Sequence, residues 1–231
     1  MSHPQATGPT DLAAARRAGW LAIAAFVLLA VLTFWVTRAS GHPLPGDASL
    51  HRWSVAHRPP TAAAAARAVT DTGTGVIPYA VLLVVGMYLG RTARRRCAVA
   101  LALMVCLGAG QALRYALMSM VARPRPPVGD WVAHASGWSF PSGHTTTGAM
   151  TAALVLAALA LGGRGASRLA VVVIALWGGS VGLTRVYLGV HWFTDVLAGW
   201  LLAVGWVSVL AWAYLRWAPT VQDPPSVQEE E

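Results

Sequence analysis

The sequence has 231 residues, of which 56% are hydrophobic and only 11% are charged, whereas soluble domains carry about 25% charged residues. This composition excludes an ordinary soluble domain and indicates a membrane protein. The formal net charge of +8 does not indicate nucleic-acid binding, because the arginines flank apolar segments and form no continuous basic face.

Six apolar segments are long enough, or nearly so, to cross about 30 Å of hydrocarbon as helices. They predict an all-α, polytopic membrane protein in which one six-helix bundle occupies residues 18–215. The second and fifth segments are the shortest. The predicted spans are Ala18–Thr37, Thr74–Gly90, Cys97–Ala122, Thr145–Gly163, Leu169–Thr184 and Val196–Leu215.

The polar ends of the chain are not expected to join the bundle. Residues 1–17 precede an uncharged run of about 20 residues, which is too long for the core of a cleaved signal sequence, so we expect the first span to be retained. Residues 216–231 include the acidic, proline-containing stretch VQDPPSVQEEE, which predicts a disordered tail.

The flanking arginines predict the orientation of the bundle. They cluster on one side of the membrane, and the positive-inside rule places that side and both termini in the cytoplasm. The other side of the membrane, which we expect to be a bacterial plasma membrane, carries loops 38–73 and 123–143 and the turn 185–195. The clustered arginines are Arg16, Arg17, Arg91, Arg94, Arg95, Arg96, Arg164, Arg168 and Arg216.

The first outer loop contains a predicted helix. Leu50, Trp53 and His57 recur at helical spacing, and an alanine-rich stretch follows them. Two arrangements fit this pattern. The helix lies in the membrane interface with Trp53 at the level of the lipid headgroups, or it packs on the outer mouth of the bundle.

The two cysteines offer no disulfide and no metal site. Cys97 and Cys106 lie on one predicted helix, about 13 Å apart along its axis, so they cannot bond to each other. A metal site would need more ligands. We interpret both as small residues of the core.

Ionisable residues near the spans gather on the outer side. Such groups are costly in or near a bilayer, so each is a candidate functional group. With helices that alternate in direction, three segments far apart in the sequence meet at one face. These segments are residues 122–127 (ARPRPP), 141–144 (PSGH) and 184–196 (TRVYLGVHWFTDV).

The first segment presents two arginines. Its three prolines prevent a helix from continuing and hold the backbone extended, which places Arg123 and Arg125 at the membrane surface. Guanidinium groups bind phosphate oxygens in pairs. Alone, the segment also fits an ordinary basic loop.

The second segment predicts an anion site at a helix start. Pro141 and Ser142 suit the first positions of a helix, Gly143 allows a ligand to approach the backbone, and the exposed N–H groups attract an anion. His144 lies in the first turn, and its ordinary pKa of about 6.5 lets it transfer a proton. The alternative is a simple helix cap with an interfacial histidine.

The third segment contains a candidate nucleophile. His191 and Asp195 are four residues apart and share one face if this stretch is helical. The carboxylate would accept a hydrogen bond from one imidazole nitrogen and leave the other free to attack. A purely structural His–Asp pair remains the alternative.

Together, the three segments resemble the signature of the type 2 phosphatidic acid phosphatase superfamily, membrane lipid phosphate phosphatases related to the vanadium haloperoxidases. That signature reads Lys, six residues, Arg-Pro; then Pro-Ser-Gly-His; then Ser-Arg, five residues, His, three residues, Asp. The second part is intact at residues 141–144, and the third has Thr184 in place of serine. The first keeps Arg125 but has Met118 where lysine belongs.

The chain contains no lysine, so the role of that residue is absent or reassigned. Arg114 lies one helical turn from Met118 and has the required charge and reach. Helix side chains lean toward the N-terminus, here away from the site, but a long arginine can extend outward. We expect Arg114 to contribute to phosphate binding.

The resemblance implies a phosphohistidine mechanism. His191 would attack phosphorus, Asp195 would hold its ring, and His144 would protonate the leaving group and then activate water. Neither a metal nor another cofactor is implied, because guanidinium groups and a helix terminus stabilise the phosphoryl charge. The implied phosphate ligands are Arg125, Arg185, Ser142, the Gly143 backbone and Arg114.

The resemblance also implies a lipid phosphatase that acts outside the cytoplasm on a polyprenyl pyrophosphate, such as undecaprenyl pyrophosphate, or on a phosphatidic-acid-type lipid. One alternative is a phosphatase of a soluble phosphate ester. Another is a non-catalytic membrane protein that binds lipid phosphates, which the missing lysine favours. The complete set of His144, His191 and Asp195 argues against it.

Overall fold

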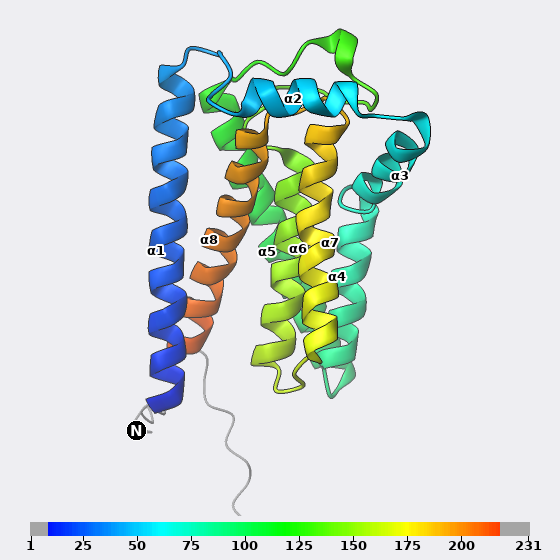
Figure 1. Ribbon diagram of the computed structural model, residues 1–231. Coiled ribbons are helices and arrows are strands. Elements are labelled where there is room, and N and C mark those ends of the chain that lie inside the picture. The colour runs from blue at the N-terminus through cyan, green and yellow to red at the C-terminus, as the bar shows by residue number, and fades with distance from the viewer. Residues whose placement is uncertain (1–8, 218–231) are drawn as a thin grey trace, which may run out of the picture.

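The computed structural model describes residues 9–217 (Figure 1). Residues 1–8 of the expected N-terminal segment and residues 218–231 of the expected tail lie outside the described residues. Across residues 9–217 the regular elements are all helical, which confirms the predicted fold class. They are α1 (Pro9–Arg38), α2 (Asp47–Ala56), α3 (Pro60–Asp71), α4 (Val76–Leu89), α5 (Ala93–Val121), the 3-10 helix η1 (Val128–Asp130), α6 (Gly143–Leu161), α7 (Arg168–Tyr187) and α8 (Phe193–Trp217).

Each predicted span coincides with a helix. Within the described residues, five helices are long and apolar enough to cross a membrane by themselves, namely α1, α5, α6, α7 and α8. Helix α4 has 14 residues and passes the same test only together with α3, from which it is bent by 50°. The first helix begins at Pro9, before the predicted start of its span, because residues 11–17 are rich in helix-forming alanine and arginine.

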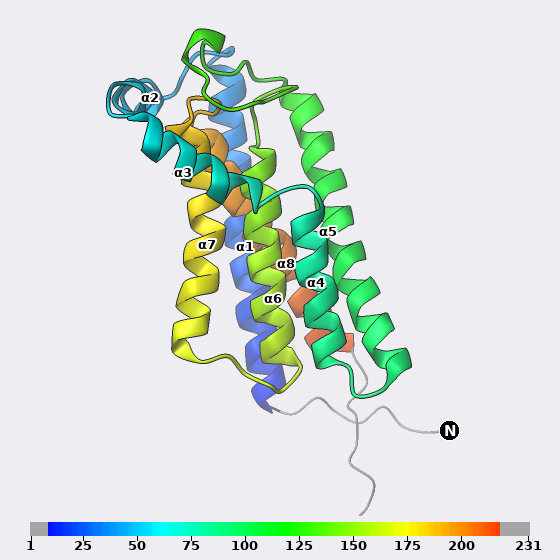
Figure 2. The ribbon, with the colours of Figure 1, turned by 90° about the vertical axis from the view of Figure 1, so that its right-hand side faces the viewer.

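The helices pack around α6 and α8. Helix α1 lies along α8, α6 contacts both α7 and α8, and α4 pairs with α5. Figure 2 shows α7 and the α4–α5 pair on opposite sides of the bundle, with α6 between them. The pairing of α4 with α5 is close because Gly86 has no side chain, and a Cβ atom there would lie 2.3 Å from the Ala100 Cα atom.

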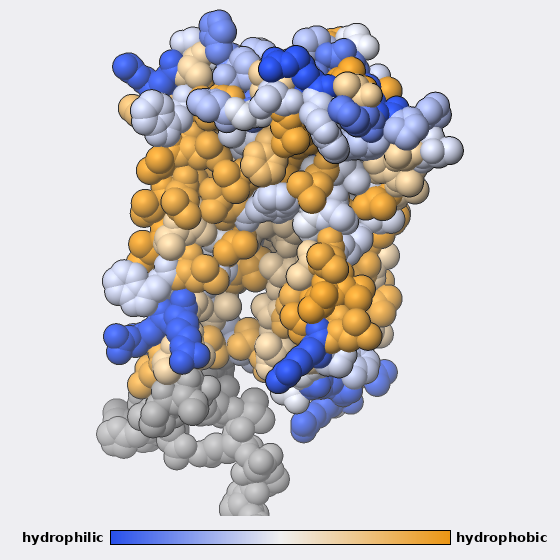
Figure 3. Space-filling model, viewed as in Figure 1, coloured by the Kyte–Doolittle hydropathy of each residue, from blue (hydrophilic) through white to orange (hydrophobic). Residues whose placement is uncertain are grey.

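The outer surface has the distribution expected of a membrane protein. Figure 3 shows, on the face that it views, an apolar band between two polar ends. Large apolar side chains of this band are exposed, among them Trp20 and Phe34 of α1 and Leu176 of α7. This pattern is the one expected when the hydrocarbon chains of a bilayer surround the bundle.

The two ends of the bundle differ. One end carries the start of α1, the end of α8 and the α4–α5 and α6–α7 connections, where the predicted arginine clusters lie. The other end, which we call the capped end, is covered by α2, α3 and loop 122–142 (Figures 1 and 2). All three motif segments therefore reach the capped end.

The helix predicted in the first outer loop is α2, and α3 follows it. Helix α2 lies across the capped end and contacts α7 and α8, as in the second of the two predicted arrangements. Its buried residues are Asp47, His51 and Ser54, whereas Trp53 is 53% exposed and stacks on His57 with ring centroids 5.1 Å apart. The face that α2 turns inward is thus the polar one.

The expectation of two core cysteines is wrong for Cys97. This residue is exposed in the second turn of α5, and Cys106 is half-buried. Residues 91–98, which include Cys97, are all exposed at the uncapped end of the bundle.

Candidate active site

Loop 122–142 starts where α5 is forced to end. Ala122 adopts a left-handed conformation with φ of 46°, and Pro124, Pro126 and Pro127 prevent the helix from resuming. The loop crosses the capped end and returns to its own start, where the Ser139 N–H donates to the Arg123 carbonyl at 2.8 Å. This closure fixes both arginines of the segment relative to α6.

The start of α6 is attached to the start of α8. Ser142 is the N-cap of α6, and its N–H donates to the Asp195 carbonyl at 3.1 Å. Its hydroxyl is fully buried and accepts a hydrogen bond from the Thr145 hydroxyl at 2.9 Å. Ser142 therefore joins two helices, and its side chain does not reach the cavity described below.

The turn between α7 and α8 carries His191. Gly189 adopts a φ of 78°, and a Cβ atom there would lie 2.5 Å from the Asp130 carbonyl oxygen. Helix α8 starts at Phe193, so His191 precedes it, and the condition of a helical 191–195 segment is not met. The turn still brings the His191 Nδ1 and Asp195 Oδ2 atoms to 3.4 Å.

A cavity of about 350 Å³ brings most of the predicted residues together. His144 of α6 and His191 both line it, as do Gly143 and three arginines, Arg114, Arg125 and Arg185. Asp195 lies behind His191 and does not line it. The wall also includes residues that the sequence did not single out: Tyr79 of α4, Gln111 and Tyr115 of α5, Thr147 of α6, and His134 and Ser136 of loop 122–142.

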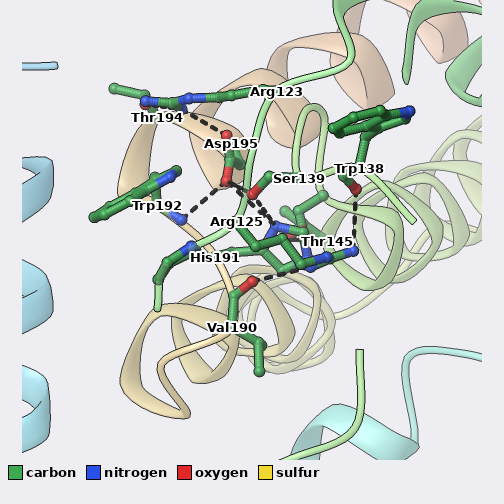
Figure 4. A network of polar contacts seen from close by, with 12 residues as sticks. Arg123, Arg125, Trp138, Ser139, Thr145, Val190, His191, Trp192, Thr194 and Asp195 are labelled. Carbon is green, nitrogen blue, oxygen red and sulfur yellow. Dashed lines mark hydrogen bonds and ion pairs between the residues drawn. The ribbon is translucent and has the colours of Figure 1, made fainter. Parts of the chain in front are cut away.

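Arg125 is held by backbone carbonyl groups. Its Nε atom donates to the Gly137 carbonyl at 2.9 Å, and its Nη2 atom donates to the carbonyls of Ser136 at 2.7 Å and Trp138 at 3.0 Å. The Nη1 atom donates to the Val190 carbonyl at 2.9 Å. Figure 4 shows the guanidinium group of Arg125 next to His191.

The contact between Arg125 and His191 fixes the tautomer of the imidazole. The Arg125 Nη1 atom lies 2.8 Å from the His191 Nε2 atom. Since a guanidinium group only donates hydrogen bonds, Nε2 is the acceptor and the ring proton is on Nδ1. The Nδ1–H group then faces Asp195, and the lone pair of Nε2 faces the cavity.

Burial keeps His191 neutral. The imidazole lies in a turn outside the spanning helices, and burial lowers its pKa to about 4. The carboxylate of Asp195 opposes this decrease, whereas the positive charges of Arg125 and Arg185 add to it. At neutral pH the ring is therefore unprotonated at Nε2, as a nucleophile must be.

The other two arginines of the cavity are anchored differently. Arg185 is buried; its Nη2 atom donates to the His134 carbonyl at 3.1 Å and its Nη1 atom contacts the Thr70 hydroxyl at 3.4 Å. Among the residues that the structure describes, the Arg185 Nε atom has no hydrogen-bond partner. The side chain of Arg114 extends toward Met118, whose sulfur lies 3.3 Å from Nη1, so it overcomes the N-terminal lean of helix side chains.

Gly143 allows Arg114 to approach the start of α6. A Cβ atom at residue 143 would lie 3.3 Å from the Arg114 Nη1 atom. The guanidinium group and the N-terminus of α6 are therefore adjacent, and both favour an anion.

Arg123, the other arginine of the first motif segment, turns away from the cavity. Its buried guanidinium group forms ion pairs with Asp195 at 2.6 Å and with Asp47 at 2.8 Å (Figure 4). The expectation that the loop presents both arginines at the membrane surface is thus wrong for Arg123, which is buried. Asp47 was not recognised from the sequence, where it is one acidic residue in a polar loop.

Both carboxylate oxygens of Asp195 also accept hydrogen bonds from groups other than His191. Oδ1 accepts from Arg123, and Oδ2 accepts from the Trp192 N–H at 2.9 Å and from the Ser139 hydroxyl.

Within residues 9–217, no three His, Cys, Asp or Glu side chains gather as metal ligands. The positive charge at the cavity comes from its arginines.

The cavity lies at one end of a membrane bundle and combines three arginines with a neutral histidine. These features place the chain in the class of integral membrane proteins that act on phosphate groups. Comparison with known protein families identifies the family more specifically than the site alone. Residues 98–219 match the PAP2 superfamily, so the match covers more than half of the chain, and the chain belongs to this superfamily. The resemblance seen in the sequence is confirmed.

Known relatives of the chain are membrane phosphatases. The lipid A 1-phosphatase of Rhizobium etli is 44% identical over 78 residues, which are 33% of this chain and 29% of that protein. The phosphatidylglycerophosphatase B of Bacillus subtilis is 29% identical over 167 residues, which are 68% of this chain and 78% of that protein.

A solved structure has the same fold. It is the transmembrane PAP2-type phosphatidylglycerolphosphate phosphatase from Bacillus subtilis, with a TM-score of 0.73 and 21% sequence identity. The match covers 88% of this chain and all of the solved chain. The likeness extends beyond the signature segments to the whole bundle.

Proposed function

We propose that this PAP2-type membrane phosphatase hydrolyses a phosphate monoester or a pyrophosphate of a membrane lipid through a phosphohistidine at His191. The observation that carries the proposal is the orientation of the imidazole. Its protonated Nδ1 atom faces Asp195, and its Nε2 atom faces the cavity beside Arg125.

The first chemical step requires Arg125 to change its acceptor. In the resting structure the Nη1 atom of Arg125 donates to His191 Nε2, which occupies the lone pair. An incoming phosphate oxygen is a stronger acceptor for that N–H group because it is charged. Transfer of the hydrogen bond to phosphate frees Nε2 and places the phosphorus next to it.

Nε2 then forms a bond to phosphorus while the bond from phosphorus to the leaving oxygen breaks. His144, on the wall of the same cavity, acts as the imidazolium, donates the proton that the leaving oxygen needs and becomes neutral. In the second step a water molecule gives its proton to His144 and attacks the phosphohistidine, which releases phosphate and restores the neutral ring.

The arginines of the cavity stabilise the equatorial oxygens in both steps. Arg125, Arg185 and Arg114 supply positive charge from three different elements, and the N–H groups at the start of α6 add to it. The buried Ser142 hydroxyl is not used for this purpose. Its position supports a role in holding α6 against α8.

A lipid substrate is favoured by the position of the cavity. Its wall includes Tyr79, Gln111 and Tyr115 from α4 and α5, so it extends between two helices of the apolar band. A phosphate bound near His191 thus lies close to the hydrocarbon region where lipid tails remain. The names of the relatives also favour phospholipid and lipid A phosphates.

We further propose that the capped end faces outward and the termini face the cytoplasm. The clusters that include Arg94, Arg95 and Arg96 lie at the opposite end of the bundle from the cavity, which supports this orientation through the positive-inside rule. Substrates would then be lipids of the outer leaflet, such as undecaprenyl pyrophosphate or phosphatidic-acid-type lipids.

Phosphate release by purified protein in detergent tests the proposal. We expect turnover of phosphatidate, phosphatidylglycerol phosphate or undecaprenyl pyrophosphate with and without a chelator, and loss of turnover in His191→Ala. Ser49→Ala, at an exposed position of α2, is the matched control and retains activity. Preference for a soluble ester would identify the first alternative, and lipid phosphate binding without release would identify the second.

A further inference from the structure

Helix α2 buries a polar face against the segments that hold His191 and Asp195. Asp47 and Ser54 are at most 2% exposed, whereas Trp53 on the other face of the helix is exposed. A helix that only covered the bundle would bury its apolar face. Because a buried carboxylate is costly unless it is fully paired, the environment of Asp47 indicates a specific role.

Asp47 accepts four hydrogen bonds. Its Oδ1 atom accepts from the Thr194 N–H at 3.0 Å. Its Oδ2 atom accepts from the Thr194 hydroxyl at 2.7 Å, from Arg123 Nη2 at 2.8 Å and from the Leu44 N–H at 3.0 Å. Asp47 therefore fixes Thr194 in the first turn of α8, next to Asp195.

Arg123 connects Asp47 to Asp195. Its Nη2 atom donates to Asp47, and its Nη1 atom donates to Asp195 Oδ1 at 2.6 Å. One guanidinium charge is thus shared between two buried carboxylates. With Asp47 ionised, this group of three side chains carries one net negative charge; without it, Arg123 would cancel the charge of Asp195.

We propose that Asp47 is a positioning residue for the His191–Asp195 pair, which neutralises Arg123 so that Asp195 keeps its negative charge facing the imidazole. This inference rests on the phosphohistidine mechanism proposed above. When Nε2 bonds to phosphorus, the ring becomes positive and retains its Nδ1 proton. An uncompensated carboxylate at Asp195 stabilises that charge, and a neutralised one does not.

The charge balance around His191 makes the proposal testable by pH dependence. Two variants, Asp47→Asn and Arg123→Gln, change the net charge near His191 in opposite directions and leave the residues of the cavity wall unchanged. The charged and titratable groups around the imidazole and along the cavity that it lines are Asp195 of α8, Arg125 and His134 of loop 122–142, Arg185 of α7, His144 of α6, Arg114 and Tyr115 of α5, and Tyr79 of α4.

The experiment measures the acid limb of kcat/KM for phosphate release, where protonation of His191 stops attack. Asp47→Asn removes a negative charge, so we expect the limb to move to lower pH by about half a unit or more. Arg123→Gln removes a positive charge and moves the limb to higher pH. Asp47→Asn combined with Arg123→Gln returns it toward the wild-type position.

The folded fraction of each variant is measured at every pH and the rates are normalised to it, because a folded fraction that changes with pH would itself shift the limb. The ionisation of the substrate cancels because all variants use the same lipid. Asp47→Asn also lowers kcat by roughly 10- to 100-fold with little change in KM, because Asp47 does not line the cavity.

Asp130→Asn is the matched control. Asp130 lies at the capped end and pairs with His51 of α2 at 2.9 Å. Within residues 9–217 its side chain forms no hydrogen bond or ion pair with Arg123 or Asp195, so kcat and the acid limb stay at wild-type values. Limbs that do not move, or that move in the same direction in both variants, overturn the role of Asp47. Absence of turnover in the wild-type protein would instead overturn the proposed function.

Discussion

At the scale of single residues, Arg114 lies where it could take the place of the lysine that the chain lacks. The superfamily signature has a lysine where this chain has Met118, and the Arg114 side chain extends along α5 to contact the sulfur atom of that methionine. It also lies over the ring of Tyr115, 3.7 Å from the centroid. The guanidinium group thus reaches the cavity from one turn deeper in the membrane.

We expect a lysine at position 118 to restore the activity that is lost when Arg114 is removed. Arg114→Ala removes one of three cavity arginines, and we expect kcat/KM to fall about 100-fold. Adding Met118→Lys restores much of the activity, because its ammonium group extends to the same wall. Met120→Lys, at a position that is 81% exposed, is the control and restores nothing. Equal effects of the two lysines would contradict the assignment.

The neutral state of His191 predicts a loss of stability in acid. Its pKa is about 4 in the folded protein and about 6.5 in an unfolded chain. Between these values the unfolded chain binds the additional proton, so the free energy of unfolding decreases as pH falls through this window.

Thermal unfolding in detergent measures this effect. We expect the midpoint of the wild-type protein to fall more steeply than that of His191→Gln from neutral pH to about pH 5. His57→Gln replaces an exposed histidine that stacks on Trp53, and its midpoint follows the wild type. Parallel curves for the wild type and His191→Gln would show that the ring is not buried in its neutral form.

At the scale of elements, the start of α6 lies in close contact with two other helices. Gly143 lies against the guanidinium group of Arg114, and the preceding Ser142 attaches the helix to α8. The proposed anion site would therefore be assembled from α5, α6 and α8 together and not from one helix.

Gly143→Ala tests this assembly. The added methyl group would lie 3.3 Å from the Arg114 Nη1 atom and displace the guanidinium group, so we expect kcat/KM to fall about tenfold with little change in the thermal midpoint. Gly179→Ala of α7 is the matched control, because its methyl group meets no atom within 4 Å. Unchanged kinetics in Gly143→Ala would place Arg114 outside the phosphate site.

At the scale of the whole molecule, the arrangement of helices followed from the sequence. A hydrocarbon layer requires about 20 apolar residues for each span, so the apolar runs located the helices. The three motif segments were expected at one face, and the structure brings them to the capped end. His191 was expected on a helical face but lies in the turn before α8.

The role of Asp47 could not be predicted in the same way. Its contacts with Arg123 and Thr194 join residues 76 and 147 positions apart, and no local pattern specifies them. The inward direction of Arg123 and the buried hydroxyl of Ser142 likewise depend on how α2 and α8 pack. Periodicity locates helices, whereas these contacts are set by tertiary structure.

The orientation of the bundle predicts which cysteine reagents react in cells. Cys97 is exposed beside Arg94, Arg95 and Arg96, at the end proposed to face the cytoplasm. A membrane-impermeant maleimide should label it only after cells are permeabilised, whereas Ser49→Cys at the capped end is labelled on intact cells. Labelling of Cys97 on intact cells would reverse the proposed orientation.

The way in which Arg125 is held affects how the protein tolerates sequence change. The groups that fix its guanidinium are main-chain oxygens of residues 136–138 and 190, and an amide oxygen is present whichever side chain the residue carries. Positions 136 and 138 are therefore free to vary in evolution without loss of the cradle, as long as the path of the loop is kept. A phosphate ligand can thus be preserved among relatives whose intervening residues have little in common.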